Sequence, residues 1–176
     1  QAAYRYIIDL NTRENIDGPE LAPLRSLLER SVKPFRSGRL SGIPWWKYER
    51  ARPELYAALG KLKRALMCSQ TSKYVTFAFA PTGTVFSQKL VVFAIDDNPS
   101  FATLQSRAHE AWVLCFGSTM KDDPVYATTD CFDTFPFPPD WESSPALEAA
   151  GKTYYDFRAA LMVRNNQGLT TTYNRF

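Results

Sequence analysis

Apolar positions along the chain first recur at helical spacing and later at the spacing of strands. Leucines line one face of residues 20–31 opposite charged side chains, which predicts an amphipathic helix that begins after Pro19. Residues 74–79 are instead rich in β-branched and aromatic side chains, as is typical of a strand. The same reasoning predicts further helices over 53–62, 100–116 and 145–164, and strands over 65–70, 74–80 and 90–95, the last of them buried on both faces.

The segments between these elements are rich in proline, glycine and polar residues. Residues 32–44 hold two prolines and two glycines and predict a mobile loop, and residues 118–123 predict a polar loop. Asn98 or Ser100 is the expected N-cap of the helix that follows. Residues 130–139 predict an extended segment punctuated by prolines. Together these elements predict an α/β (α+β) fold with a mixed β-sheet of about four to six strands flanked by helices.

Composition places the chain among globular proteins. Its 176 residues are 45% hydrophobic, 14% aromatic and 22% charged, which suits one domain and excludes a disordered or fibrous chain. No apolar stretch approaches the ~20 residues of a membrane span, and no secretory signal opens the chain. We therefore expect a cytoplasmic protein without a membrane partner. Because the sequence begins with Gln1 rather than Met, we expect it to be part of a longer polypeptide.

Cysteine and histidine usage argues against two kinds of site. The three cysteines are widely spaced and odd in number, which favours buried cytoplasmic thiols over a disulfide framework. A single histidine, His109, and cysteines without a C-x-x-C pair make a zinc site improbable. We expect no metal and no cofactor in this chain.

The charge distribution is more informative than the net charge of +3. Residues 30–73 contain eleven Lys and Arg against two Glu, a formal charge of +9, whereas the other 132 residues carry −6. A block of like charges repels itself unless a polyanion lies nearby, so nucleic acid is the natural candidate partner. The alternative is that several of these side chains form an ordinary solvated helix face. Interleaved aromatic residues could stack on bases or could equally belong to the core; these are Trp45, Trp46, Tyr48, Tyr56 and Tyr74.

The common catalytic motifs are absent. The sequence has no G-x-G-x-x-G or Walker phosphate loop and no G-x-S-x-G nucleophile turn. His109 is expected to be structural or to contact a partner rather than to act as a base. Asp97 is expected to cap a helix, and the pair at 122–123 to satisfy loop amides, rather than to bind a metal. From its residues alone, the chain is a basic, aromatic-rich binding module with no catalytic residue of its own.

Two uncommon strings carry a family resemblance. They are Asp-Cys-Phe-x-Thr-Phe-Pro-Phe-Pro at 130–138 and Met-Val-Arg-Asn-Asn-x-Gly-Leu-Thr at 162–170. The chain resembles the part of large single-chain, adenine-specific DNA methyltransferases of bacterial restriction–modification or phage defence that follows the catalytic domain. The likeness covers about three quarters of the chain in one order, and its other matching segments are 45–47, 52–56, 72–74, 77–79, 81–87, 89–93, 104–106, 118–123 and 158–176.

The resemblance implies a target recognition domain, the module that reads double-stranded DNA while another domain of the same polypeptide transfers the methyl group. The family's (Asn/Asp/Ser)-Pro-Pro-(Tyr/Phe) motif and its glycine-rich S-adenosylmethionine loop are missing from this sequence. S-adenosylmethionine is therefore expected for the parent enzyme only, and this chain should bind DNA without methylating it. Residues 1–142 are expected to form the recognition domain. Residues 143–176 are expected to form a helical extension that packs on it or on a neighbouring domain.

Base methylation requires the base to be flipped out of the duplex, so the enzyme must hold the surrounding DNA. Lys and Arg contacts to phosphates supply affinity and register, and a few side chains at base edges supply sequence choice. The candidates for phosphate contact are Arg36, Arg39, Lys47, Arg50 and Arg52. The candidates at predicted turns or strand ends, where a reading loop would lie, are Gln70, Ser72, Lys73 and Lys121.

Two other functions are compatible with the same residues. A protein-interaction module of a defence complex would explain the aromatic residues and polar loops without DNA contact. An RNA-reading role would use the same basic block.

Overall fold

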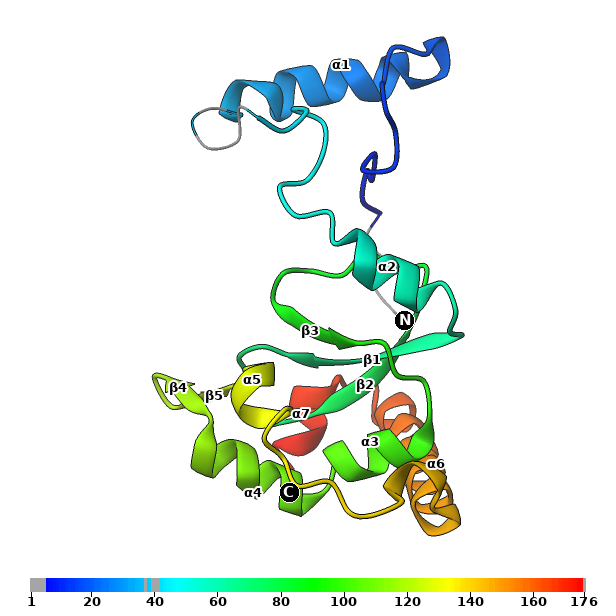
Figure 1. Ribbon diagram of the computed structural model, residues 1–176, viewed down its shortest axis with the longest axis vertical. Helices are drawn as coiled ribbons and strands as arrows, with labels where there is room; N and C mark the ends of the chain where they lie inside the picture. Colours follow the sequence, from blue (N-terminus) through cyan, green and yellow to red (C-terminus); the bar gives the residue numbers. More distant parts are fainter. Residues whose placement is uncertain (1–5, 37, 39–41, 176) are drawn as a thin grey trace. The chain divides into compact units, whose positions relative to one another are not determined.

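The computed structural model describes residues 6–36, 38 and 42–175 of the chain (Figure 1). The backbone divides into two compact units, Gln1–Glu54 (unit 1) and Leu55–Phe176 (unit 2). Each unit has its own cluster of buried apolar side chains. The division of the recognition domain from an extension at residue 142 stays a prediction.

Helix α1 (Ala22–Ser31) is the principal element among the described residues of unit 1. It follows a 3-10 turn, η1 (Pro19–Leu21), and a second turn, η2 (Lys33–Phe35), comes after it. The helix predicted over 20–31 is thus confirmed, and Pro19 occupies its expected place at the first turn. The core of unit 1 consists of Leu10, Ile16 and Leu28, with both tryptophans of the Trp45–Trp46 pair packed against them.

Five strands in two sheets and the helices around them make up the rest of the described residues, an α+β fold. The strands are β1 (Arg64–Ser69), β2 (Phe77–Pro81), β3 (Leu90–Phe93), β4 (Ser118–Met120) and β5 (Asp123–Val125). The helices are α2 (Pro53–Leu59), α3 (Asn98–Leu104), α4 (Arg107–Phe116), α5 (Thr128–Cys131), η4 (Trp141–Ser143), α6 (Pro145–Asn165) and α7 (Leu169–Tyr173).

The number of strands agrees with prediction, but their arrangement does not. Instead of one mixed sheet, the described strands form an antiparallel three-stranded sheet, ordered β2-β1-β3, and an antiparallel β4–β5 hairpin. Strand β3 lies at an edge, and its residues 90–92 are only partly buried. The prediction that it is buried on both faces is therefore wrong. An apolar run does not distinguish an edge strand from a central one, because that depends on which strand pairs with it.

Helix α3 and helix α4 replace the single helix predicted over 100–116. The break occurs at Ser106, whose hydroxyl accepts a hydrogen bond from the backbone N–H of His109 at 3.2 Å and so caps α4. Asp97, not Asn98 or Ser100, is the N-cap of α3, since its carboxylate accepts the Ser100 N–H at 2.7 Å. The expected capping role of Asp97 is confirmed.

Two predicted irregular segments contain regular structure. Residues 118–123 belong to the β4–β5 hairpin, with Lys121 at its turn in the left-handed conformation (φ 57°). The segment predicted as extended over 130–139 begins inside α5. These pairings and short turns depend on contacts with neighbouring segments, which single-sequence periodicity does not capture.

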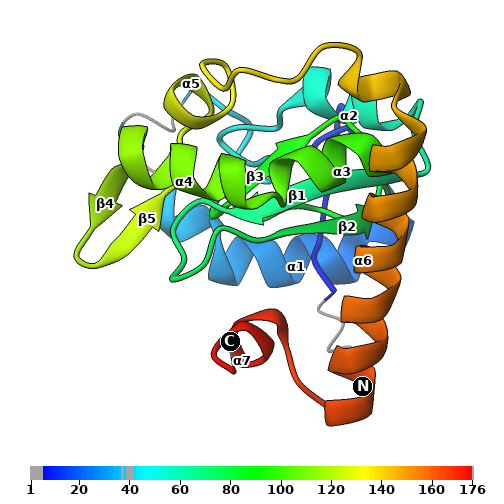
Figure 2. The same ribbon diagram turned by 90° about the horizontal axis from the view of Figure 1, so that it is seen from below.

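The core of unit 2 lies between the three-stranded sheet and helices α3 and α4, which run along one face of it (Figures 1 and 2). Phe77 from β2 and Phe101 from α3 are fully buried there. Helix α6 packs on α3 and ends at Asn165, and the left-handed conformation of the C-cap residue Asn166 breaks the helix. Figure 2 shows that α6 extends from beside α3 towards α7, and that α7 lies on the β2 side of the sheet.

No helix among the described residues is both long enough and apolar enough to cross a membrane.

Candidate nucleic-acid interface

The phosphate-contact candidates of unit 1 differ in how they are held. Arg36 is partly buried, and its guanidinium donates a hydrogen bond to the backbone carbonyl of Lys47 at 2.6 Å. It therefore fixes the chain around Lys47. Arg50 and Arg52 are exposed, and Arg52 has a left-handed backbone conformation (φ 52°). Arg39 lies outside the described residues.

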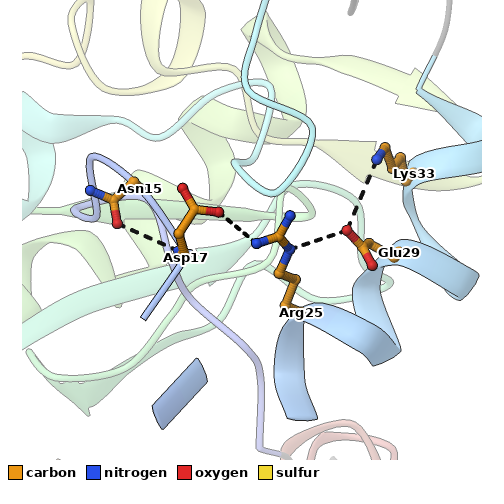
Figure 3. Close-up of polar contacts among 5 residues, drawn as sticks. All are labelled: Asn15, Asp17, Arg25, Glu29 and Lys33. Atoms are coloured by element: carbon orange, nitrogen blue, oxygen red, sulfur yellow. Dashed lines mark hydrogen bonds and ion pairs between the residues drawn. The ribbon is translucent and has the colours of Figure 1, made fainter. Parts of the chain in front are cut away.

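Other basic side chains of unit 1 are compensated by carboxylates (Figure 3). Arg25 contacts Asp17 at 2.6 Å and Glu29 at 3.1 Å, and Lys33 lies 4.0 Å from Glu29. Part of the positive charge of this unit thus stabilises α1 and its N-terminal connection. Such exposed pairs contribute only ~0–1 kcal/mol each, but they leave less net charge for a polyanion.

The aromatic residues of the basic block serve internal contacts. Trp45 and Trp46 meet edge to face, with ring centroids 5.7 Å apart, and pack on the core of unit 1. The Tyr48 hydroxyl donates a hydrogen bond to the carbonyl of Ile8 at 2.7 Å. The structure therefore supports the core alternative for this tryptophan pair over a stacking surface for bases.

In unit 2 the structure brings the predicted reading residues onto adjoining segments. The backbone N–H of Gln70 donates to the carbonyl of Lys89 at 2.8 Å, and its carbonyl accepts from the N–H of Tyr126 at 2.8 Å. The Ser72 N–H reaches the carbonyl of Pro124 at 3.4 Å. The loop after β1 is thus hydrogen-bonded both to the start of β3 and to the β4–β5 hairpin, whose turn carries Lys121.

Side chains around this loop present polar and basic groups to solvent. Gln70, Lys73 and Lys121 are exposed, and Ser72 is partly buried. Lys89 is also exposed, and its backbone carbonyl accepts the Gln70 N–H, which places it beside this loop. It was not among the residues predicted from the sequence. No sequence signal identified Lys89, because its place beside the loop follows from the pairing of β1 with β3. We define the reading-loop surface as Gln70, Ser72, Lys73, Lys89 and Lys121.

Lys73 is anchored by the far end of the chain. Its ammonium donates a hydrogen bond to the Asn174 side-chain carbonyl at 2.8 Å, and the Tyr74 hydroxyl donates to the same oxygen at 3.0 Å. The Lys73 ammonium also lies 5.0 Å from the centre of the Tyr74 ring. Asn174 is a second residue that sequence reasoning missed, since its partners lie about a hundred positions away.

Burial in unit 2 favours the neutral forms of His109, Cys68 and Tyr126. His109 is fully buried, its Nε2 lies 2.9 Å from the Tyr126 hydroxyl, and burial lowers its pKa to about 4. Burial also raises the pKa of the Cys68 thiol and of the Tyr126 phenol well above their usual ranges. His109 is therefore a structural residue, as predicted. His109, Cys68 and Tyr126 are all buried in unit 2.

The predicted burial of the cysteines is confirmed for two of the three residues. Cys68 and Cys131 are buried free thiols, whereas Cys115 is exposed because the buried face of α4 is formed by His109 and Val113. Among the described residues, no three His, Cys, Asp or Glu side chains come together as a possible metal site.

Comparison with known proteins connects this geometry to a family. The family model described as MmeI, target recognition domain, matches residues 7–139. Among curated proteins there is no match.

A solved structure of the Type IIL restriction-modification enzyme MmeI in complex with DNA is similar to this chain, with a TM-score of 0.55 and 19% sequence identity. The likeness covers 88% of this chain and 21% of that chain, so this chain spans about a fifth of the length of that neighbour. At this identity the structural likeness shows the fold alone. The family match, which extends over most of the chain, shows more: the chain belongs to the MmeI target recognition domain family.

Proposed function

We propose that this chain is the DNA-reading module of a restriction–modification methyltransferase. The observation that carries the proposal is the family match over residues 7–139. The fold shared with a restriction-modification enzyme that was solved in complex with DNA supports it. The exposed basic side chains and the reading-loop surface supply the chemistry that duplex DNA requires.

In the parent enzyme, a catalytic domain outside this sequence would transfer a methyl group from S-adenosylmethionine to adenine. That domain would take the flipped base, while this module holds the surrounding duplex in register. The absence of the methyltransferase motifs from residues 1–176 supports this division of labour. The parent enzyme would act in the bacterial cytoplasm, in restriction–modification or phage defence.

The proposed contacts are of two kinds. Lys47, Arg50 and Arg52 would contact phosphates in unit 1, where they fix position without reading sequence. The reading-loop surface would face base edges and the phosphates beside them. Lys pairs with guanine and Gln with adenine by geometry, so Lys121 and Gln70 have the chemistry for such contacts.

The test is titration of the chain against a short random-sequence DNA duplex by fluorescence anisotropy at several salt concentrations. We expect affinity to fall steeply with salt, because binding to phosphates releases condensed counterions. Arg50→Glu combined with Arg52→Glu should weaken binding about tenfold or more for all sequences alike, since each substitution replaces an attraction to phosphate with a repulsion.

The matched control is Arg107→Glu combined with Lys152→Glu. It changes charge by the same amount on exposed side chains that are ion-paired in α4 and α6. Salt-insensitive binding, or equal losses in the two double variants, would contradict the proposed phosphate contacts. Preference for RNA in competition, or no nucleic-acid binding by the folded chain, would instead favour the RNA-reading or protein-interaction alternatives.

A further inference from the structure

The C-terminal helix α7 reaches back to the reading-loop surface. Asn174, directly after α7, accepts hydrogen bonds from Lys73 and Tyr74 through one oxygen atom. The rings of Tyr74 and Tyr173 also contact each other, with centroids 5.8 Å apart. These contacts join two segments that are about a hundred residues apart and lie on either side of the family match boundary at residue 139.

The helix that carries these contacts is itself firmly attached. Arg158 of α6 is buried, and its guanidinium donates to the Tyr173 hydroxyl at 3.1 Å, to the Gln105 side-chain carbonyl at 3.0 Å and to the backbone carbonyl of Phe77 at 2.6 Å. These three hydrogen bonds offset part of the cost of burying the guanidinium. Arg158 thereby holds α7 against the start of β2.

The acceptor at Lys73 is a neutral amide and not a carboxylate. Elsewhere in unit 2, Lys152 pairs with Asp156 at 2.6 Å, and Arg107 pairs with Glu110. Lys73 takes part in none of the ion pairs found among the described residues. A carboxylate would orient the ammonium and also cancel its charge, whereas the amide of Asn174 orients it and leaves the charge in place.

We propose that Asn174 is a positioning residue that presents Lys73 to a DNA phosphate. An ammonium has three donors, of which one is directed at Asn174, so donors remain for a phosphate oxygen. The segment beyond the family match thus completes the DNA-contacting surface. This inference rests on the proposed function, because it names the ligand of the same surface.

A double-mutant cycle on the whole chain tests the inference, with binding to a random-sequence duplex followed by anisotropy at several salt concentrations. Lys73→Gln should weaken binding roughly threefold to tenfold and lower the steepness of the salt dependence by about 0.9, the value for one phosphate contact. Asn174→Leu should weaken binding by a smaller factor. The double variant should bind no worse than Lys73→Gln, because Asn174 acts through Lys73.

A third variant separates positioning from a structural role. Asn174→Asp retains the acceptor for Lys73 and Tyr74, so its melting temperature should match or exceed that of the unmodified chain, yet it cancels the Lys73 charge. It should therefore bind DNA less tightly than Thr171→Asp, which adds the same charge to an exposed position of α7.

The inference fails if the losses in Lys73→Gln and Asn174→Leu multiply, if Lys73→Gln binds normally, or if Asn174→Asp binds like Thr171→Asp. Those outcomes would leave DNA recognition by the chain intact. If the folded, unmodified chain binds no duplex at all, the proposed function and this inference both fall.

Discussion

At the scale of single residues, burial decides what a titratable side chain can do. His109 is the only histidine and would be the natural candidate for a general base, yet it is fully buried on the inner face of α4. Its Nε2 pairs with the Tyr126 hydroxyl, and its ring contacts those of Phe77 and Phe135. Because this environment disfavours the imidazolium form, His109 contributes to folding as a neutral polar core residue.

This burial predicts a pH dependence of stability. The pKa of His109 is about 4 in the folded chain, whereas an exposed histidine has a pKa of 6.5. Between these two pKa values, His109 is protonated in the unfolded chain and neutral in the folded chain. The free energy of unfolding therefore falls as pH decreases from 6.5 towards 4. We expect a loss of about 1–2 kcal/mol between pH 7 and 5 in urea unfolding.

The control for this prediction is His109→Gln, which can hydrogen-bond to Tyr126 but gains no proton in this pH range. Its stability should change less between pH 7 and 5 than that of the unmodified chain. Parallel pH profiles for the two proteins would show that His109 is not the group responsible.

At the scale of elements, the contact between α3 and α6 depends on a glycine. Gly151 is buried in the middle of α6, and a Cβ atom at this position would overlap the backbone carbonyl oxygen of Asn98 at the start of α3. Glycine is normally unfavourable inside a helix by about 1 kcal/mol relative to alanine. Here it permits the close approach through which α6 reaches the core and carries Arg158 to Phe77.

Gly151→Ala is therefore expected to destabilise the chain, although alanine is the better helix former. Because the neighbouring atom belongs to the backbone and cannot rotate away, we expect a net loss of about 1–3 kcal/mol in chemical unfolding. Gly83→Ala is the matched control, since a Cβ there meets no atom within 4 Å. A Gly151→Ala variant at least as stable as the unmodified chain would show that α6 packs less closely on α3.

At the scale of the whole molecule, charge and core are divided between the two units. Unit 1 contains ten Lys and Arg against seven Asp and Glu, a net charge of +3, whereas unit 2 contains eleven of each and is neutral. The basic block at 30–73 crosses this division. Sequence-independent electrostatic attraction to a polyanion is therefore concentrated in unit 1. The reading-loop surface lies on unit 2, whose net charge is zero.

Residues 55–176 alone should consequently fold but bind DNA more weakly. Their core is separate from that of unit 1, so we expect a cooperative thermal transition by circular dichroism. Binding to random duplex DNA should be weaker and less salt-dependent than for the whole chain, because fewer phosphates are contacted. An unfolded fragment would show that the two cores depend on each other, and an unchanged salt dependence would place the phosphate contacts in unit 2.

Local patterns predicted the elements whose stability is local. The helices over 20–31 and 145–164 carry their own start and stop signals, including Pro19, Pro145 and Asn166, and the structure contains both. The break at Ser106 was missed because apolar spacing continues across it. The hairpin at 118–125 was missed because polar residues pair into strands only when a partner strand is present.

Sequence by itself determined the α+β class, the principal helices and strands and, through uncommon strings such as 130–138, the resemblance to a DNA-recognition module. These properties reside in local periodicity and in residue identity. Tertiary structure alone decided which charges are available: Arg25 is paired with acids, Arg36 serves the backbone, and Lys73 is held by the neutral side chain of Asn174. The residue type gives the charge of a side chain. Whether that charge is cancelled depends on which distant residues the fold places within hydrogen-bonding distance.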